Sequence, residues 1–368
     1  MEYKYIGKTS EQSEKEIKEK DMADFNPNDI GIANGRYFAL PYDAEEAEIV
    51  ILPVGWDVTT SYAAGTSEGP EAVKEASLQV DLFDLSYPEA WKVRIGTLDA
   101  PAWLEGKNAI YRAKAEKVIE ALGEGASQES VQSLCDEINE ASAKLNEAVY
   151  NAAMEQIQKG KTVALLGGDH STPLGAIKAA ADRYGKIGVL HIDAHADLRE
   201  AYEGFKYSHA SIMFNVLAEL GEKVAALTQV GIRDFCSDEY MLMRTDARVF
   251  PFTDRYLCES QYTGSNWNDL CDDIIATLPE KVYVSFDIDG LSPEYCPHTG
   301  TPVPGGLSFN QADYLLRKLS ESGKEIVGFD LNEVSPSELD EWDANVGARL
   351  LFKMCIYSKN SHKKSKKD

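Results

Sequence analysis

The chain has 368 residues, 43% of them hydrophobic and 27% charged, which is an ordinary mixture for a globular protein and not for a disordered one. Its formal net charge of −24 gives a surface that repels nucleic acids and anionic membranes, so we expect neither as a partner. No apolar run approaches the roughly 18 residues of a membrane span, and six scattered cysteines without a CxxC pair indicate free thiols in the reducing cytoplasm.

The chain divides into three segments by composition. Residues 1–45 are polar, without clear periodicity or the apolar core of a secretory signal, and are expected to form an N-terminal extension over the main domain. Residues 46–358 contain no internal repeat and no linker, which predicts one domain. Residues 359–368, "KNSHKKSKKD", are basic and are expected to be a short solvated tail.

Apolar runs typical of buried strands alternate with stretches of helical periodicity through the main domain. In chain order, the expected strands are 48–54, 93–98, 162–168, 187–193, 224–232, 248–252, 281–289 and 325–334. The expected helices are 127–160, 172–183, 209–220, 237–244, 267–278, 310–321 and 343–356. This alternation predicts a mostly parallel sheet that is covered by helices on both faces.

Polar side chains stand where the expected strands end. "GGDHS" closes the strand at 162–168, "DAHAD" the strand at 187–193, and "DID" the strand at 281–289. In an open parallel sheet the carboxyl ends of the strands meet at one edge, where ligand sites form. We therefore expect two histidines and four aspartates to come together: His170, Asp193, His195, Asp197, Asp287 and Asp289.

Four buried carboxylates so close would repel one another and take up protons, and bound divalent cations remove that conflict. A carboxylate and imidazole set without thiolate suits harder ions such as Mn²⁺. Six ligands with shared acids suit two ions about 3.5–4 Å apart, which together activate one water. Each motif alone is commonly an ordinary strand end or turn. Their joint occurrence predicts a dinuclear metal site.

Two further histidines lie outside this set. His191 alternates onto the same strand face but lies deeper in the sheet, so we expect a core histidine with satisfied hydrogen bonds. His298 lies in the Pro- and Gly-rich stretch "CPHTGTPVPGG", where a surface position and a pocket position are both open.

The motifs "GGDHS", "DAHAD", "SFDID" and "TGTPVPGG", together with "WDVTTSYAAGTSEGPEAV" at 56–73, closely resemble the ureohydrolase family of arginases and agmatinases. The resemblance covers roughly residues 46–356 and is nearer to the agmatinase branch. It implies an arginase-like three-layer α/β/α sandwich, a homo-oligomer (trimer or hexamer), and a dinuclear Mn²⁺ site, with Ni²⁺ used in some relatives. Residues 46–358 would then be the catalytic domain.

The resemblance also implies a role for each matched residue. One metal would take His170 and Asp197, the other His195 and Asp289, with Asp193 and Asp287 bridging both. Asp197 would orient the attacking hydroxide and pass a proton to the leaving amine. His209, in "YSHAS", matches the proton-shuttling histidine, and Glu333 matches the acid that pairs with the substrate guanidinium. These roles suit the residue types, because a carboxylate pairs well with a planar cation and histidine titrates near neutral pH.

The expected substrate is a small cationic guanidino compound, with agmatine the first choice and free guanidine the alternative. The two segments expected at the pocket rim, residues 56–70 and 335–343, contain no Arg or Lys that would hold a substrate carboxylate. The second segment carries four acids that could attract an ammonium group or simply be solvated: Glu338, Asp340, Glu341 and Asp343. Ser292 and His298 depart from the family pattern beside the pocket loop, whereas every inferred ligand matches.

Three other functions are weighed against this one. A mononuclear metal-dependent deacetylase of the same fold would need one metal, and the six ligand-type residues argue for two. A non-catalytic scaffold protein would have no reason to keep those ligands together with His209 and Glu333. A nucleic-acid enzyme is disfavoured by the net charge.

Overall fold

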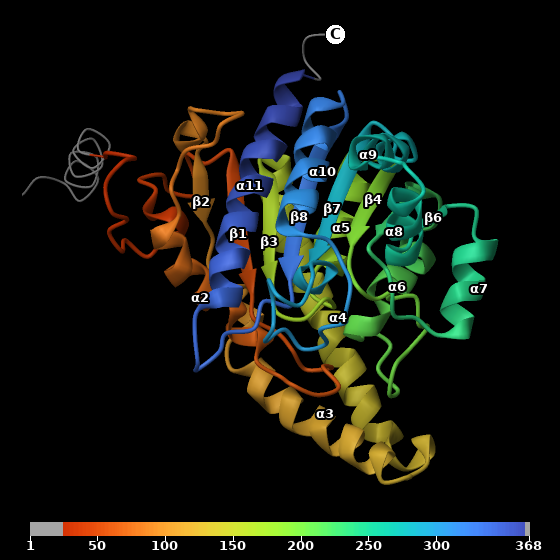
Figure 1. Ribbon diagram of the computed structural model, residues 1–368. Coiled ribbons are helices and arrows are strands. Elements are labelled where there is room, and N and C mark those ends of the chain that lie inside the picture. The colour runs from red at the N-terminus through yellow and green to blue at the C-terminus, as the bar shows by residue number, and fades with distance from the viewer. Residues whose placement is uncertain (1–24, 365–368) are drawn as a thin grey trace, which may run out of the picture.

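The computed structural model describes residues 25–364, and Figure 1 shows a central sheet between two layers of helices. The strands are β1 Ile49–Val54, β2 Ile95–Thr97, β3 Thr162–Gly167, β4 Ile187–Ile192, β5 Val224–Val230, β6 Val249–Phe252, β7 Lys281–Asp287 and β8 Glu325–Asn332. They form one eight-stranded sheet in the order β2-β1-β3-β8-β7-β4-β5-β6, and every neighbouring pair is parallel.

Ten α-helices lie within the described residues. They are α2 Gly69–Ala76, α3 Lys107–Gly123, α4 Gln128–Gln158, α5 Leu174–Tyr184, α6 Ile212–Leu220, α7 Ser237–Thr245, α8 Asp254–Tyr262, α9 Trp267–Ala276, α10 Phe309–Glu321 and α11 Trp342–Lys364. Buried side chains of α2 and α8–α11 pack on one face of the sheet, and those of α3–α7 pack on the other. The predicted α/β/α sandwich is confirmed.

The central strands are buried on both faces, which is why their sequences read as continuous apolar runs rather than as alternating ones. All eight expected strands and all seven expected helices are present, with ends shifted by a few residues in most cases. No helix of residues 25–364 is long and apolar enough to cross a membrane.

Three helices of the structure were not expected from the sequence: α2, α3 and α8. Helix α3 is 17 residues long, but only Ala115 and Val118 are buried, so it carries almost no apolar stripe to read. Helices α2 and α8 have eight and nine residues, too few to show a helical period clearly.

Both predicted terminal segments contact the domain where the structure describes them. Phe38 of the N-terminal extension is buried against Phe352 of α11, with ring centroids 5.2 Å apart. At the other end, α11 continues past residue 358, and Ser361 Oγ accepts a hydrogen bond from the backbone N–H of Ile326 in β8 (3.0 Å). The first residues of the basic tail are therefore helical and packed on the domain, so the expectation of a solvated tail was wrong for them.

Candidate metal centre

The site forms at the carboxyl ends of β3, β8, β7 and β4, which are consecutive neighbours in the sheet. "GGDHS" turns sharply after β3, and a Cβ atom at Gly168 would collide with the backbone of Trp56. Glycine therefore lets two chain segments approach closely and leaves His170 facing the next strand ends. All six residues expected as ligands meet at this edge.

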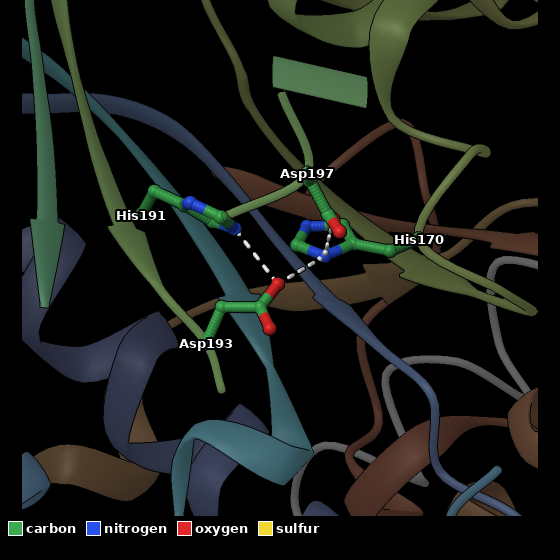
Figure 2. Close-up of side chains that lie close together, drawn as sticks. All are labelled: His170, His191, Asp193 and Asp197. Atoms are coloured by element: carbon green, nitrogen blue, oxygen red, sulfur yellow. Dashed lines mark hydrogen bonds and ion pairs between the residues drawn. The ribbon is translucent and has the colours of Figure 1, made fainter. Parts of the chain in front are cut away.

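His170 is surrounded by carboxylates. Its Nδ1 atom lies 2.9 Å from Asp193 Oδ2, 3.3 Å from Asp197 Oδ2 and 3.3 Å from Asp287 Oδ2. Its other ring nitrogen, Nε2, lies 2.9 Å from Ser285 Oγ, which in turn donates to Asp330 Oδ1. Ser285 and Asp330 thus orient the ring so that Nδ1 faces the acids, as Figure 2 shows for Asp193 and Asp197.

A second group adjoins the first. His195 Nδ1 lies 3.1 Å from Asp289 Oδ2 and 3.5 Å from Asp193 Oδ1. Asp193 therefore directs one carboxylate oxygen to the His170 group and the other to the His195 group. This is the arrangement of a carboxylate that two cations could share. Asp287 lies in the His170 group, and its Oδ1 accepts from the backbone N–H of Asp289 (2.8 Å).

The cluster carries an excess of negative charge. Five of the six side chains are at most 5% exposed, while that of His195 is 25% exposed. Burial and the Asp193 carboxylate raise the pKa of Asp197 to about 7, and burial, Asp289 and Asp193 raise the pKa of Asp287 well above its usual range. No described lysine or arginine side chain forms an ion pair with these acids. The oxygen-rich set with two imidazoles fits divalent cations, which would neutralise it.

His191 lies against this cluster and is completely buried. Its Nε2 is 2.8 Å from Asp193 Oδ2, and Gln229 contacts its Nδ1 at 3.0 Å. As expected of a core histidine, both ring nitrogens have hydrogen-bond partners, but one of those partners is an expected metal ligand.

A cavity of about 440 Å³ opens above the cluster. His195, Asp197 and His209 line it, together with the aromatic side chains of Tyr62 and Tyr202. Burial, and to a lesser degree the positive charge of His195, lowers the pKa of His209 to about 4, so this imidazole is neutral at pH 7. His209 is the first residue of a short 3-10 helix, His209–Ser211, which the Ser208 side chain caps. The backbone N–H of His209 donates to Thr59 Oγ1 (3.2 Å).

Glu333 lies at the end of β8, next to the cluster of expected ligands. It is 5% exposed, and its Oε1 accepts from the backbone N–H of His170 (2.9 Å). Glu333 does not itself line the 440 Å³ cavity, whereas Thr301 does, and Thr299 of the same loop donates through its Oγ1 to the Glu333 carbonyl (2.7 Å). Burial and the neighbouring Asp169 raise the pKa of Glu333 well above its usual range, so a cationic partner would stabilise its charged form.

The acidic residues that were expected at the pocket rim lie away from the cavity above the cluster. Asp340, Glu341 and Asp343 line a separate cavity of about 220 Å³ between α2 and α11, and none of the four acids lines the cavity above the expected ligands. His298 contacts one of these acids, since its Nδ1 lies 2.9 Å from Asp343 Oδ1, but it lines neither cavity. Tyr62 does line the larger cavity, whereas Trp342 and Ser292 do not.

Arg199 also lines the larger cavity, a position that was not expected from the sequence. Its guanidinium lies over the Tyr202 ring, 4.8 Å from the centroid, and its Nε is 3.7 Å from Glu239 Oε2. Glu239 is buried and offsets this positive charge. The signal was present in the sequence, since Arg199 follows directly after "DAHADL".

Comparison with known proteins gives consistent matches. The sequence model of the arginase family matches residues 47–356. An N(1)-aminopropylagmatine ureohydrolase of Thermus thermophilus is 33% identical over 299 residues, which are 81% of this chain and 85% of the relative. An agmatinase of Pyrococcus horikoshii is 29% identical over 84% of this chain and 92% of its own.

Solved structures share the fold. The proclavaminate amidino hydrolase of Streptomyces clavuligerus superposes with a TM-score of 0.71 at 23% identity, covering 91% of this chain and all of that one. An arginase from Bacillus caldovelox superposes with a TM-score of 0.60 at 21% identity, over 84% of this chain and 98% of its own.

Proposed function

The chain belongs to the arginase family of metal-dependent ureohydrolases, and we propose that it releases urea from a small cationic guanidino compound without a carboxylate, with agmatine the first choice. The observation that carries this proposal is the shared position of Asp193 between two imidazole–carboxylate groups below one cavity. A site for a single metal would have no use for both groups, which disfavours a mononuclear deacetylase.

We propose that His170 and Asp197 hold one divalent cation, that His195 and Asp289 hold another, and that Asp193 and Asp287 bridge them. Mn²⁺ is the first choice and Ni²⁺ the second, because the donors are oxygen and imidazole nitrogen without thiolate. When bound, such a pair of cations would lower the pKa of a water enough for it to lose a proton and attack a guanidinium carbon at neutral pH.

The chain's own residues would divide the remaining work. Glu333 would pair with the guanidinium and hold its plane against the cluster. Water adds to the guanidinium carbon, and the bond from that carbon to the substituted nitrogen breaks, giving urea and an amine. Asp197, whose carboxylate lines the cavity, would take the proton of the water and deliver it to the leaving nitrogen. His209, neutral and at the same cavity, would carry the second proton of the water, which is released as the C=O bond of urea forms, to the amine product or to solvent.

Three features of the cavity support the choice of substrate. Arg199 Nε lies 3.7 Å from Glu239 Oε2, which reduces the positive charge that a substrate carboxylate would meet at this residue. Asp234 is exposed at the cavity wall, where it could attract an ammonium group. A volume of about 440 Å³ is far larger than free guanidine requires, which disfavours our alternative substrate. The names of two relatives add N(1)-aminopropylagmatine, with a longer cationic tail, to the candidates.

We further propose that the enzyme works in the cytoplasm as a trimer or hexamer, with residues 46–358 as its catalytic domain. All six cysteines are free in the structure, as a reducing compartment requires. Light scattering on the purified full chain measures the assembly size.

The decisive experiment measures urea release with Mn²⁺- and Ni²⁺-loaded enzyme on agmatine, N(1)-aminopropylagmatine, guanidine, arginine and 4-guanidinobutyrate, together with metal content per chain. We expect two metals per chain and the highest kcat/KM on a cationic substrate without a carboxylate. A single metal per chain, or a preference for arginine or 4-guanidinobutyrate, would refute the proposal. Guanidine ahead of agmatine would select the alternative substrate.

A further inference from the structure

His191 is enclosed between an expected bridging ligand and an amide on the next strand. It lies on β4 directly opposite Gln229 of β5 in the sheet register, and the side chains of both residues are completely buried. Its Nε2 is 2.8 Å from Asp193 Oδ2, while its Nδ1 is 3.0 Å from Gln229 Nε2. Figure 2 shows the ring of His191 directed at Asp193, on the opposite side from His170.

The contacts of Gln229 determine which nitrogen of His191 carries the proton. Gln229 Nε2 lies 2.8 Å from the backbone carbonyl oxygen of Ala196. A carbonyl can only accept a hydrogen bond, so the side-chain atom facing it must be the amide nitrogen. The second hydrogen of that amide points to His191 Nδ1, which therefore accepts. The proton of the neutral ring must then be on Nε2, facing Asp193.

A protonated ring nitrogen cannot bind a metal, so this geometry makes His191 a donor and not a seventh ligand. Asp193 receives a second donor as well, because the backbone N–H of His195 donates to its Oδ1 (2.6 Å). Apart from the imidazoles of the expected ligands His170 and His195, each carboxylate oxygen of Asp193 thus has one donor, and it retains a lone pair for a cation. The two donors fix the plane of the carboxylate that both groups share.

We propose that His191, oriented by Gln229, is a positioning residue that holds Asp193 for metal binding. The inference rests on the proposed dinuclear site. Neighbouring groups that fix the orientation of a ligand commonly contribute about 10- to 100-fold to metal affinity or activity. A histidine that merely fills the core would contribute to stability alone.

Two variants of nearly equal size separate these roles. His191→Gln places an amide N–H close to the position of the imidazole Nε2 and can still accept from Gln229, whereas His191→Met fills the same space without a donor. The readouts are Mn²⁺ affinity by chelator competition, Mn²⁺ content per chain, and thermal stability of the metal-free protein. None of these depends on the identity of the substrate.

We expect His191→Met to lose about 10- to 100-fold in Mn²⁺ affinity, and His191→Gln to recover most of that loss. Unchanged affinity in His191→Met, with a lower melting temperature only, would make His191 a packing residue and overturn the proposal. Equal losses in both variants would overturn it too, since the N–H donor would then be irrelevant.

A second variant covers the case in which His191→Met does not fold. Gln229→Met leaves His191 in place but removes the donor that keeps the proton on Nε2, so Mn²⁺ affinity should fall in the same direction. Unchanged affinity there would contradict the role of Gln229. Failure of the proposed function would look different, because the wild-type protein itself would then bind fewer than two metals or release no urea.

Discussion

Replacing Glu333 by glutamine tests whether this carboxylate binds the substrate guanidinium. Glu333 Oε1 already accepts from the backbone N–H of His170 at 2.9 Å, which leaves Oε2 for a ligand. In Glu333→Gln, the amide oxygen would keep the bond from His170, so the NH₂ group would be turned toward the guanidinium. A donor would then face a donor where the wild-type side chain offers a charged acceptor.

The magnitude follows from that geometry. A hydrogen bond to a charged group contributes about 1.5–3 kcal/mol, and truncating one partner of a buried charge pair costs about 2–5 kcal/mol. The opposed donors place this variant in the upper part of the range, so we expect a loss of about 3–5 kcal/mol. At 1.4 kcal/mol per tenfold change, kcat/KM for agmatine should fall about 10²- to 10⁴-fold.

The assay compares kcat/KM for urea release and metal content in the wild type, Glu333→Gln and Asp343→Asn. Asp343 is a suitable control because it is equally buried near the same end of the sheet but pairs with His298, away from the cavity. We expect two metals in all three proteins and near-normal activity in the control. A Glu333→Gln enzyme with two metals and kcat/KM within a few fold of wild type would refute the assigned role.

Three further predictions concern the metal bridge, the shuttle and the acid stability of the fold. Asp193→Asn or Asp287→Asn should abolish urea release and lower the metal content to one or none, as measured by elemental analysis; two metals with full turnover would contradict the bridging assignment. His209→Asn should retain both metals and lose about 10²–10⁴-fold in kcat, whereas metal loss would make His209 a ligand. Burial tends to raise the pKa of Asp84, but the Lys353 ammonium and two backbone N–H groups lower it below the ordinary value of 3.8. The charged carboxylate therefore stabilises the fold above that value, and the contribution disappears as the pH falls through the lower folded value. Asp84→Asn should lower the free energy of unfolding by about 1–3 kcal/mol at pH 7, with a smaller difference below about pH 4 in denaturant titrations; a difference independent of pH would contradict this account.

The sheet was predictable because each of its strands is strongly apolar and is followed by a helix or a turn. A strand such as β3 is buried along its whole length, so its six residues contain no polar side chain larger than Thr162. Helix α3 was not predictable in the same way. It is largely solvated and rests on α4, and only Ala115 and Val118 are buried. A helix held mainly by its neighbour leaves little pattern in its own residues.

The meeting of the expected ligands was predictable because it combines short-range spacing with one general property of parallel sheets. Asp193, His195 and Asp197 are adjacent in sequence, and the meeting of strand ends brings His170 to them. The walls of the cavity depend on loops instead, and loop paths do not follow from periodicity. The loop at 335–343 turns toward α2, so its acids leave the cavity, while Arg199 enters it from the segment after the ligands.

Backbone strain is a further feature that residue identity could not reveal. Asp197 and Glu333 have φ angles of +53° and +62°, in the left-handed region that side chains rarely occupy. Such residues cost about 1–3 kcal/mol each and persist only when their surroundings hold them. The Asp197 carbonyl accepts from the backbone N–H groups of Met213 and Phe214, and the Glu333 carbonyl accepts from Thr299 Oγ1.

The acids of the site differ in backbone conformation, and the difference follows the roles that we propose for them. Asp193 and Asp287, which we assign to the metals alone, follow their strands without positive φ angles. Six described non-glycine residues have positive φ angles, and Asp197 and Glu333 are the two among them whose carboxylates our proposal places in contact with the substrate or its protons. A carboxylate on a regular strand end is directed by the pleat of the strand, whereas a left-handed residue turns its side chain out of that direction. Regular strand geometry would therefore suffice to direct the two acids that we propose as bridges. The left-handed backbone would direct Glu333, and also Asp197, which holds a cation in our proposal as well, toward the substrate.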